Sequence, residues 1–251
     1  MKVSICQFDP VFEDKEANKK KVSALLDSAK ELGDWVVFHE MTLTGFTASC
    51  AAATLSAADH AYFAELARSR KIWLSYGGAQ DGFNKLFTLD RSGRLVSEYS
   101  KIHLYSFGNE HKEFKAGCKQ TTFPLEGLAV TPMVCFDLRF PYLFWHLAPK
   151  TDLYVVIAGW PMRRAEHWMT LLRARAVENQ AYVIGVNRIG KEPSGLEYSG
   201  NSMVFDPLGK VALDCRSEEG VFTAELKKEL VDTTRKRFPF FNDRLKEPAF
   251  A

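Results

Sequence analysis

Three residues whose side chains could perform chemistry together follow predicted strands: Glu40, Lys101 and Cys135. Glu40 closes the apolar run WVVFHE, Lys101 follows LVSEYS, and Cys135 ends LAVTPMVC before the chain turns through FDLRFP. Side chains at the carboxyl ends of strands are exposed at the rim of a sheet, where α/β proteins build their sites. A charge next to an apolar run costs several kcal/mol to bury unless it is paired. The sequence therefore allows either a structural ion pair beside a packed cysteine, or one pocket that contains all three groups.

Cys135 is the cysteine best placed to act as a nucleophile. Cys6 and Cys215 lie inside predicted strands and are expected to pack in the core, whereas Cys50 and Cys118 lie in predicted loops without activating neighbours. A thiol with the ordinary pKa of about 8.5 is only a few per cent ionised at neutral pH. It needs a base to take its proton and a donor to stabilise an oxyanion, and carboxylate and ammonium groups suit those two roles.

Other kinds of catalytic site lack the residues that they require. No cysteine pair has zinc-finger spacing, and a helical zinc motif that would begin at His39 fails because position 43 is Leu. The sequence contains no GxxxxGK[ST] or GxGxxG phosphate loop and no GxSxG nucleophile motif. We therefore expect neither a metal nor a cofactor.

Composition limits the class of protein. The 251 residues are 46% hydrophobic and 13% aromatic, which is enough apolar surface for a folded core. Thirty-three basic residues balance 31 acidic ones, so charge gives no support for a nucleic-acid or membrane partner. Apolar runs such as LYVVIAG are far shorter than the ~20 residues of a membrane span. Five scattered cysteines and an N-terminus without a signal-peptide pattern favour the reducing cytoplasm.

The elements that must position the three residues alternate between strand and helix. In the first half, strands are predicted at KVSICQF, WVVFHE and IWLSYGG, helices at 15–32 and 57–71, and a hairpin at KLFTLD and RLVSEYS. The second half repeats the alternation, with strands at LAVTPMVCF, LYVVIAGW and AYVIGVNR, helices at PYLFWHLA and 162–180, and short strands at 202–206, 211–214 and 221–225. Two sheets packed face to face with helices outside would explain strands that are apolar on both faces.

The residues after Leu226 have a different character. The segment 226–251 is rich in basic and aromatic residues, including the run RKRFPFF, and lacks strong periodicity. We interpret it as a C-terminal tail, either solvated or clasping a neighbouring subunit, rather than as a nucleic-acid patch.

Three segments, FHEMTLTGF, SKIHLY and MVCFDLRFP, together resemble the three catalytic motifs of the nitrilase superfamily of carbon–nitrogen hydrolases. The resemblance continues through AGWPMRRAEHWMTLLRARAVENQAYVIGVNRIG and YSGNSMVFDPLGK to about Val221, and so covers nearly the whole chain. The CFDLRFP and GWP…HW stretches are most similar to the omega-amidase branch. One departure is His39, where the first motif commonly has proline; we expect it to change local contacts but not the role of Glu40.

This resemblance implies a fold and a set of catalytic roles. The fold is a single α/β domain over 1–251, a four-layer α-β-β-α sandwich that tends to form homodimers. Glu40 would be the general base, Lys101 the oxyanion stabiliser and Cys135 the nucleophile that forms a thioester. A second acidic residue after the lysine would be Glu110 or Glu113, of which Glu110 is favoured because a related branch carries Glu-His there.

The resemblance also implies a substrate and the residues that bind it. An omega-amidase hydrolyses the terminal amide of a dicarboxylate monoamide, such as 2-oxoglutaramate or succinamate, and must hold the distant carboxylate. Arg139 is the expected carboxylate ligand and Arg163 its rival, while Trp160 and Met162 would line the pocket.

Phe136 would give its backbone N–H to the oxyanion, and Phe46 would pack nearby. Two alternatives stay open. One is another amidase or carbamoylase with a different small substrate, and the other is a non-catalytic binding protein of the same fold.

Overall fold

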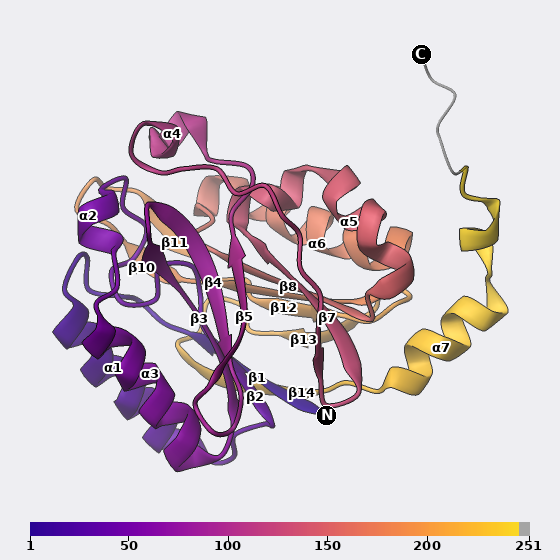
Figure 1. The fold of residues 1–251 in the computed structure, drawn as a ribbon, viewed down its shortest axis with the longest axis horizontal. Coiled ribbons are helices and arrows are strands. Elements are labelled where there is room, and N and C mark those ends of the chain that lie inside the picture. Colours follow the sequence, from indigo (N-terminus) through magenta and orange to yellow (C-terminus); the bar gives the residue numbers. More distant parts are fainter. Residues whose placement is uncertain (246–251) are drawn as a thin grey trace.

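Two six-stranded sheets form the centre of the computed structural model, which describes residues 1–245 (Figure 1). The first sheet has the spatial order β14 (Gly220–Glu225), β1 (Lys2–Gln7), β2 (Trp35–Val37), β3 (Trp73–Gln80), β4 (Phe83–Leu89) and β5 (Leu95–Ser100). The second has the order β13 (Val211–Asp214), β12 (Met203–Phe205), β9 (Tyr182–Asn187), β8 (Leu153–Ala158), β7 (Leu128–Val134) and β6 (Phe123–Leu125). A separate hairpin consists of β10 (Ile189–Lys191) and β11 (Glu197–Ser199).

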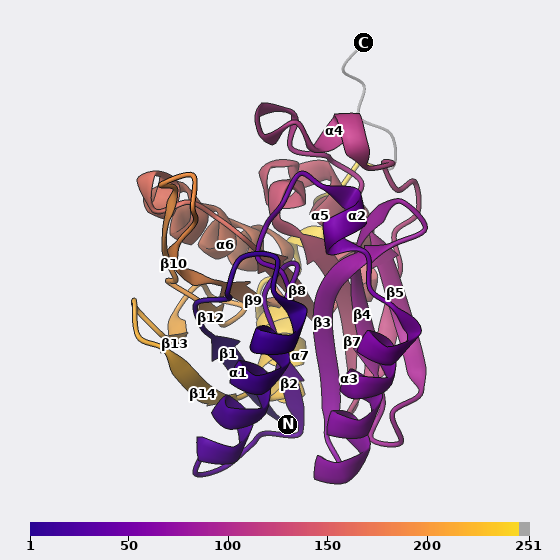
Figure 2. The same ribbon diagram turned by 90° about the vertical axis from the view of Figure 1, so that its left-hand side faces the viewer.

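Helices cover the outer face of each sheet and complete four layers (Figures 1 and 2). The first sheet carries α1 (Lys15–Ser28) and α3 (Ala57–Arg70), and the second carries α5 (Pro141–Leu147) and α6 (Ala165–Asn179). Short helices α2 (Cys50–Ala53) and α4 (Glu110–Glu113) lie in connections, and α7 (Lys228–Arg237) follows the last strand. The predicted α-β-β-α sandwich is therefore confirmed.

The alternation of side chains along each strand separates two cores. In β1, Val3 and Ile5 face the second sheet and join the large central core, whereas Cys6 faces outward and packs with Val22 of α1 and Phe63 of α3. Successive side chains of a strand point to opposite faces, so a strand covered on both sides must be apolar throughout. This packing explains the uninterrupted apolar runs in the sequence.

Strand direction brings the carboxyl ends of four strands to one end of the sandwich. In the first sheet β1, β2 and β3 are parallel, and two antiparallel steps return β5 to the direction of β3. In the second sheet β7, β8 and β9 are parallel. The loops that follow β2, β5, β7 and β8 therefore open toward the same region, near α4 in Figure 1.

Several predicted elements differ from the observed ones in their bounds. The helix predicted at 162–180 begins with a 3-10 turn (Met162–Arg164), because Arg164 departs from helical backbone angles and the α-helix starts at Ala165. Cys50 opens α2 instead of lying in a loop, and Cys215 follows β13, buried, instead of lying inside it. The capping box of Ser56 and Asp59 at the start of α3 is present as predicted.

The segment after Leu226 contains more structure than its sequence predicted. Helix α7 buries Val231 and Thr234, and the guanidinium of Arg235 donates to the backbone oxygens of Ala148, Thr151 and Gln180. A 3-10 turn follows at Phe240–Asp243. The end of the predicted tail, 246–251, lies outside the described residues.

Gly77 in β3 shows how closely the first sheet approaches the chain around Glu40. A Cβ at position 77 would lie 2.6 Å from Met41 N and 2.9 Å from Glu40 Cα. The backbone of Thr42 also donates to Gly77 O at 3.0 Å. Only glycine leaves room for this contact, which fixes the backbone on which Glu40 is carried.

No helix within residues 1–245 combines the length and the apolar character needed to cross a bilayer.

Candidate active site

Three buried charged side chains meet where the strand ends converge. Lys101, directly after β5, has a fully buried ammonium that lies 2.9 Å from Glu40 Oε1 and 2.8 Å from Glu110 Oε2. Glu40 comes from the loop after β2, and Glu110 is the first residue of α4. Both carboxylates are also fully buried. The structure thus brings together Glu40 and Lys101, and it places beside them Glu110, the acidic residue that the sequence analysis favoured.

The ammonium of Lys101 stays charged in this position. Burial alone would lower the pKa of Lys101, but the carboxylates of Glu110 and Glu40 outweigh burial and raise it above its ordinary value. A lysine that remains cationic in a dry site is a fixed positive charge and a hydrogen-bond donor. It can therefore stabilise negative charge that develops nearby.

Asn84 of β4 bridges the two carboxylates, and the sequence analysis did not identify it. Its buried Nδ2 donates to Glu40 Oε1 at 2.7 Å and to Glu110 Oε1 at 2.8 Å, while its Oδ1 has no partner among the described residues. Two acceptors facing one amide end require that end to be the NH₂ group. An isolated asparagine in a predicted hairpin strand carries no signal of this role.

The two oxygens of Glu40 have different hydrogen-bonding states. Oε1 accepts from both Asn84 and Lys101, which fills its two lone-pair directions. Within residues 1–245, Oε2 accepts one backbone hydrogen bond, from the N–H of Gly159 at 2.8 Å, just beyond the end of β8. Oε2 is therefore the atom of Glu40 with a free lone pair to receive a proton.

Cys135 lies beside this charge cluster, at the point where β7 ends. It opens a 3-10 helix (Cys135–Arg139), and its φ of +46° is in the left-handed region that a side chain rarely adopts. Burial and the carboxylate of Glu40 raise the pKa of the Cys135 thiol well above its ordinary value, against the opposing effect of Lys101. The free thiol is therefore protonated at neutral pH and needs a base at the moment of attack.

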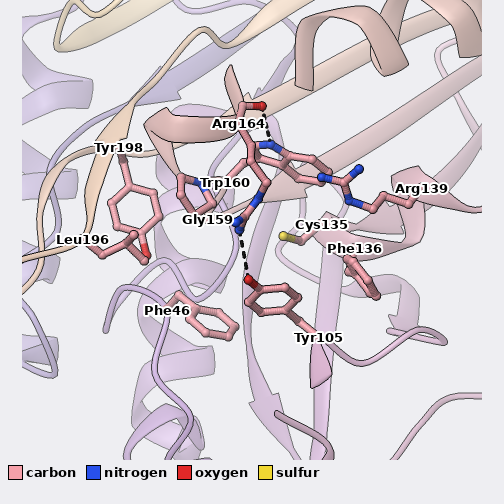
Figure 3. Close-up of a pocket in the computed structure, with 11 residues that line it drawn as sticks. Phe46, Tyr105, Cys135, Phe136, Arg139, Gly159, Trp160, Arg164, Leu196 and Tyr198 are labelled. Carbon is pink, nitrogen blue, oxygen red and sulfur yellow. Dashed lines mark hydrogen bonds between the residues drawn. The ribbon is translucent and has the colours of Figure 1, made fainter. Parts of the chain in front are cut away.

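A pocket of roughly 420 Å³, including its open mouth, lies in front of the Cys135 sulfur (Figure 3). Its wall is mostly apolar and aromatic, with two arginines. The lining residues are Phe46, Tyr105, Cys135, Phe136, Arg139, Gly159, Trp160, Pro161, Arg164, Leu196 and Tyr198.

Arg139 and Arg164 face this pocket from the second sheet (Figure 3). The guanidinium of Arg139 lies 4.8 Å from the centre of the Trp160 ring and donates to His167 Nδ1 at 3.2 Å. Arg164 donates to the Tyr105 hydroxyl at 3.0 Å, and its backbone oxygen accepts from Trp160 Nε1. Burial and the neighbouring charge of Arg164 lower the pKa of Arg139. Within the described residues neither guanidinium has a carboxylate partner, so the pocket is equipped to bind an anion.

Some residues predicted for the site lie elsewhere. Met162 is 45% exposed, and Arg163 is exposed on the same turn; neither contributes to the wall of this pocket within residues 1–245. Glu113 is exposed on the far side of α4, whereas Glu110 points inward to Lys101. The arginine of this turn that lines the pocket is Arg164, one residue after Arg163, which the sequence analysis had suggested as the alternative carboxylate ligand. A sequence motif does not show which of two adjacent arginines in a turn points toward the pocket.

His39, the departure from the usual first motif, points away from the pocket. Its ring packs 4.5 Å from Phe8, its Nδ1 donates to the backbone oxygen of Glu40 at 3.0 Å, and burial lowers its pKa to about 3. A neutral imidazole in this place braces the backbone of Glu40. It leaves the carboxylate free to face Lys101 and the pocket.

The described residues contain no group of three or more His, Cys, Asp or Glu side chains arranged to hold a metal ion.

Comparisons with known proteins place the chain among the carbon–nitrogen hydrolases. The family model for carbon–nitrogen hydrolases matches residues 2–236. The chain is 34% identical to omega-amidase YafV of Yersinia enterocolitica over 97% of this chain and 96% of that protein, and 29% identical to the 2-oxoglutaramate amidase of Bacillus subtilis over 98% of each. A CN-hydrolase superfamily protein of Xanthomonas campestris, with an arsenic adduct in its active site, superimposes with a TM-score of 0.92 at 31% identity over 98% of both chains.

Replacing Lys101 by methionine should destabilise the fold strongly. The variant leaves two buried carboxylates without their shared cation, and removing one partner of a buried ion pair costs about 3–5 kcal/mol. We expect that loss in the free energy of unfolding, measured by urea denaturation at pH 7. Lys85→Met is the matched control, because Lys85 is buried but its partner Glu98 is 48% exposed, and there a loss of only about 1 kcal/mol is expected. Equal midpoints for the two variants would contradict the charge assignment.

Proposed function

The chain belongs to the carbon–nitrogen hydrolase family and is an amidase that acts on non-peptide carbon–nitrogen bonds, and we propose that it is an omega-amidase. Its substrates would be monoamides of small dicarboxylates, such as 2-oxoglutaramate or succinamate, which it would hydrolyse to the dicarboxylate and ammonia. The observation that carries this proposal is a thiol in the pocket wall with the buried carboxylate of Glu40 beside it, together with two guanidinium groups in the wall that have no carboxylate partner within residues 1–245.

In the proposed first step, Cys135 attacks the amide carbon as Glu40 Oε2 takes the thiol proton. The C–S bond forms, the carbonyl π pair moves to oxygen, and a tetrahedral oxyanion results. The proton then passes from Glu40 to the amide nitrogen, the C–N bond breaks, and ammonia leaves a thioester. A thiol that is neutral at rest and has a carboxylate beside it suits this sequence of proton transfers.

Two donors are available for the oxyanion. Lys101 supplies an ammonium that is fixed by two carboxylates, and Phe136 supplies a backbone N–H in the first turn of the 3-10 helix, where such groups have no acceptor within the helix. Removing one donor of this type raises the barrier by about 2.7–4 kcal/mol. Glu110 serves the reaction indirectly, because both its oxygens hold Lys101.

Hydrolysis of the thioester uses the same groups in reverse. A water that enters after ammonia leaves gives its proton to Glu40 Oε2 and attacks the thioester carbon. Collapse of the second oxyanion breaks the C–S bond and returns the proton to Cys135. No cofactor takes part in either half of the reaction.

The carboxylate at the other end of the substrate would bind the two arginines. Planar guanidinium groups hold a carboxylate through paired hydrogen bonds, and the apolar surroundings strengthen that attraction. Arg139 is stacked on Trp160 and Arg164 is held by Tyr105, so both are ordered before the substrate arrives. An unpaired positive charge in a partly buried pocket is costly, and an anionic substrate removes that cost.

Ammonia release by the purified protein tests the reaction and its specificity. We expect turnover of 2-oxoglutaramate, succinamate and glutaramate, and at least a roughly 100-fold lower kcat/KM for amides whose far carboxylate is capped as a neutral amide or ester, because hydrogen bonds to a charge are lost. Cys135→Ala should release no ammonia.

Other outcomes would redirect the proposal. A Cys135→Ala variant with wild-type turnover would refute the nucleophile. Turnover that is indifferent to the far carboxylate, or confined to an N-carbamoyl substrate, would assign the enzyme to another amidase branch.

Arg139→Met and Arg164→Met should each lower kcat/KM for succinamate roughly 10- to 100-fold, since each removes hydrogen bonds to a charged group worth about 1.5–3 kcal/mol. The loss should be small for the capped substrate. Arg163→Met is the matched control from the same turn, and at 150 mM salt we expect its kcat/KM within about twofold of wild type, because screening suppresses long-range attraction. If Arg163→Met lowers kcat/KM as much as Arg164→Met does, Arg163 also takes part in binding the carboxylate, and the assignment to Arg139 and Arg164 alone is wrong.

We also propose a homodimer located in the cytoplasm. The α5–α6 face exposes Tyr142, Trp145 and Val177, which are large apolar side chains that a second copy could cover. All five cysteines are free, as expected in a reducing compartment. Sedimentation velocity should give twice the mass of one chain, and a monomer at micromolar concentration would refute the dimer. Cell fractionation tests the location.

A further inference from the structure

The strained backbone at Cys135 requires something to hold it. A left-handed φ at a residue with a side chain costs free energy and persists only where the surroundings impose it. The 3-10 helix that Cys135 opens is only five residues long and cannot impose it alone. One constraint on this turn is the side chain of Asp137, two residues further along, which accepts from the backbone directly before Cys135.

Asp137 is a fully buried carboxylate that accepts four hydrogen bonds. Oδ2 accepts from the backbone N–H of Val134 at 3.2 Å and from the Tyr99 hydroxyl at 2.8 Å. Oδ1 accepts from the backbone N–H of His103 at 2.8 Å and from its ring Nδ1 at 3.0 Å. With its lone pairs filled, this carboxylate can be buried without a lysine or arginine beside it.

The donors to Asp137 lie on both sides of Lys101. Tyr99 precedes the lysine by two residues and His103 follows it by two. Asp137 itself lies two residues beyond Cys135, and its bond to Val134 closes the turn from the other side. One side chain therefore connects the strand end that carries Lys101 to the turn that carries Cys135.

The His103 ring is held on both of its nitrogen atoms and on one face. The carboxylate of Asp137 accepts from Nδ1 of His103, and Nε2 of the same ring forms a hydrogen bond with the Tyr142 hydroxyl. The imidazole is also stacked on Phe140, with centroids 3.6 Å apart and planes 13° from parallel. Phe140 and Tyr142, which follow the turn that carries Cys135, therefore hold the His103 ring in place.

We propose that Asp137 is a positioning residue, held by His103 and Tyr99, that sets the Cys135 thiol against the Lys101 ammonium. The inference rests on the proposed roles of Cys135 and Lys101. Asp137 does not contact the pocket; it acts by fixing the distance between the attacking atom and the oxyanion donor. A misplacement of about 1 Å in such a pair can cost roughly 100-fold in rate.

Three variants test this proposal through kcat, KM and the rate at which iodoacetamide alkylates Cys135. Asp137→Asn and His103→Leu should lower kcat about 30- to 100-fold and slow alkylation, with KM within about threefold, because binding is left intact and only the reacting geometry is disturbed. His103→Asn should recover most of kcat, because its amide nitrogen takes nearly the position of Nδ1. His146→Leu, at an exposed histidine of α5, is the control and should match wild type.

Thermal melting of each variant separates positioning from folding. If Asp137→Asn does not fold, the comparison of His103→Leu with His103→Asn decides. Wild-type kcat in folded His103→Leu overturns the inference, as do equal losses in the Leu and Asn variants or a loss that appears only in KM. These results are distinct from failure of the proposed function, which Cys135→Ala reports by itself.

Discussion

One ammonium shared by two carboxylates is the interaction on which this site depends. Lys101, Glu40 and Glu110 are all removed from water, and each would be costly to bury without the others. Asn84 and the backbone N–H groups of Gly159 and Tyr105 also donate to these carboxylates. Because these contacts occupy Oε1 of Glu40 fully and Oε2 only in part, the arrangement that stabilises the buried charges also leaves Oε2 as the atom that could exchange protons with the thiol in the proposed mechanism.

The rest of the sandwich serves to hold that cluster at the junction of two sheets. The first sheet carries Glu40, Asn84 and Lys101, and the second carries Cys135 and Gly159. Large apolar side chains between the sheets fix their separation, and Gly77 lets the backbone of Glu40 approach β3. The site is therefore rigid because it lies on strand ends, and a change in sheet packing would move Glu40 relative to Cys135.

The pocket has two chemically different regions, one beside Cys135 and one beside Arg139 and Arg164. Cys135 lies in its wall beside the buried charge cluster, while the aromatic part of the wall carries two guanidinium groups with no acidic partner in the described chain. A substrate with an amide at one end and a carboxylate at the other matches both regions at once. Asp137 connects the reacting end to the fold without entering the pocket, so turnover and binding can be altered independently.

The sequence by itself determined the family and most of the helices and strands, because both depend on local pattern. Apolar runs marked the buried strands, the capping box at Ser56 marked α3, and three ordered motifs indicated Glu40, Lys101 and Cys135. Tertiary structure alone decided which further side chains join them. Asn84 stands in an ordinary local context and reaches the cluster because β4 pairs with β5, directly before Lys101. Asp137 follows Cys135 by two residues, but it meets Tyr99 and His103 only because the two sheets pack together. The choice of Glu110 over Glu113, and of Arg164 over Arg163 beside the pocket, depends on the direction in which a short helical turn points each side chain. That direction is set by packing against distant residues.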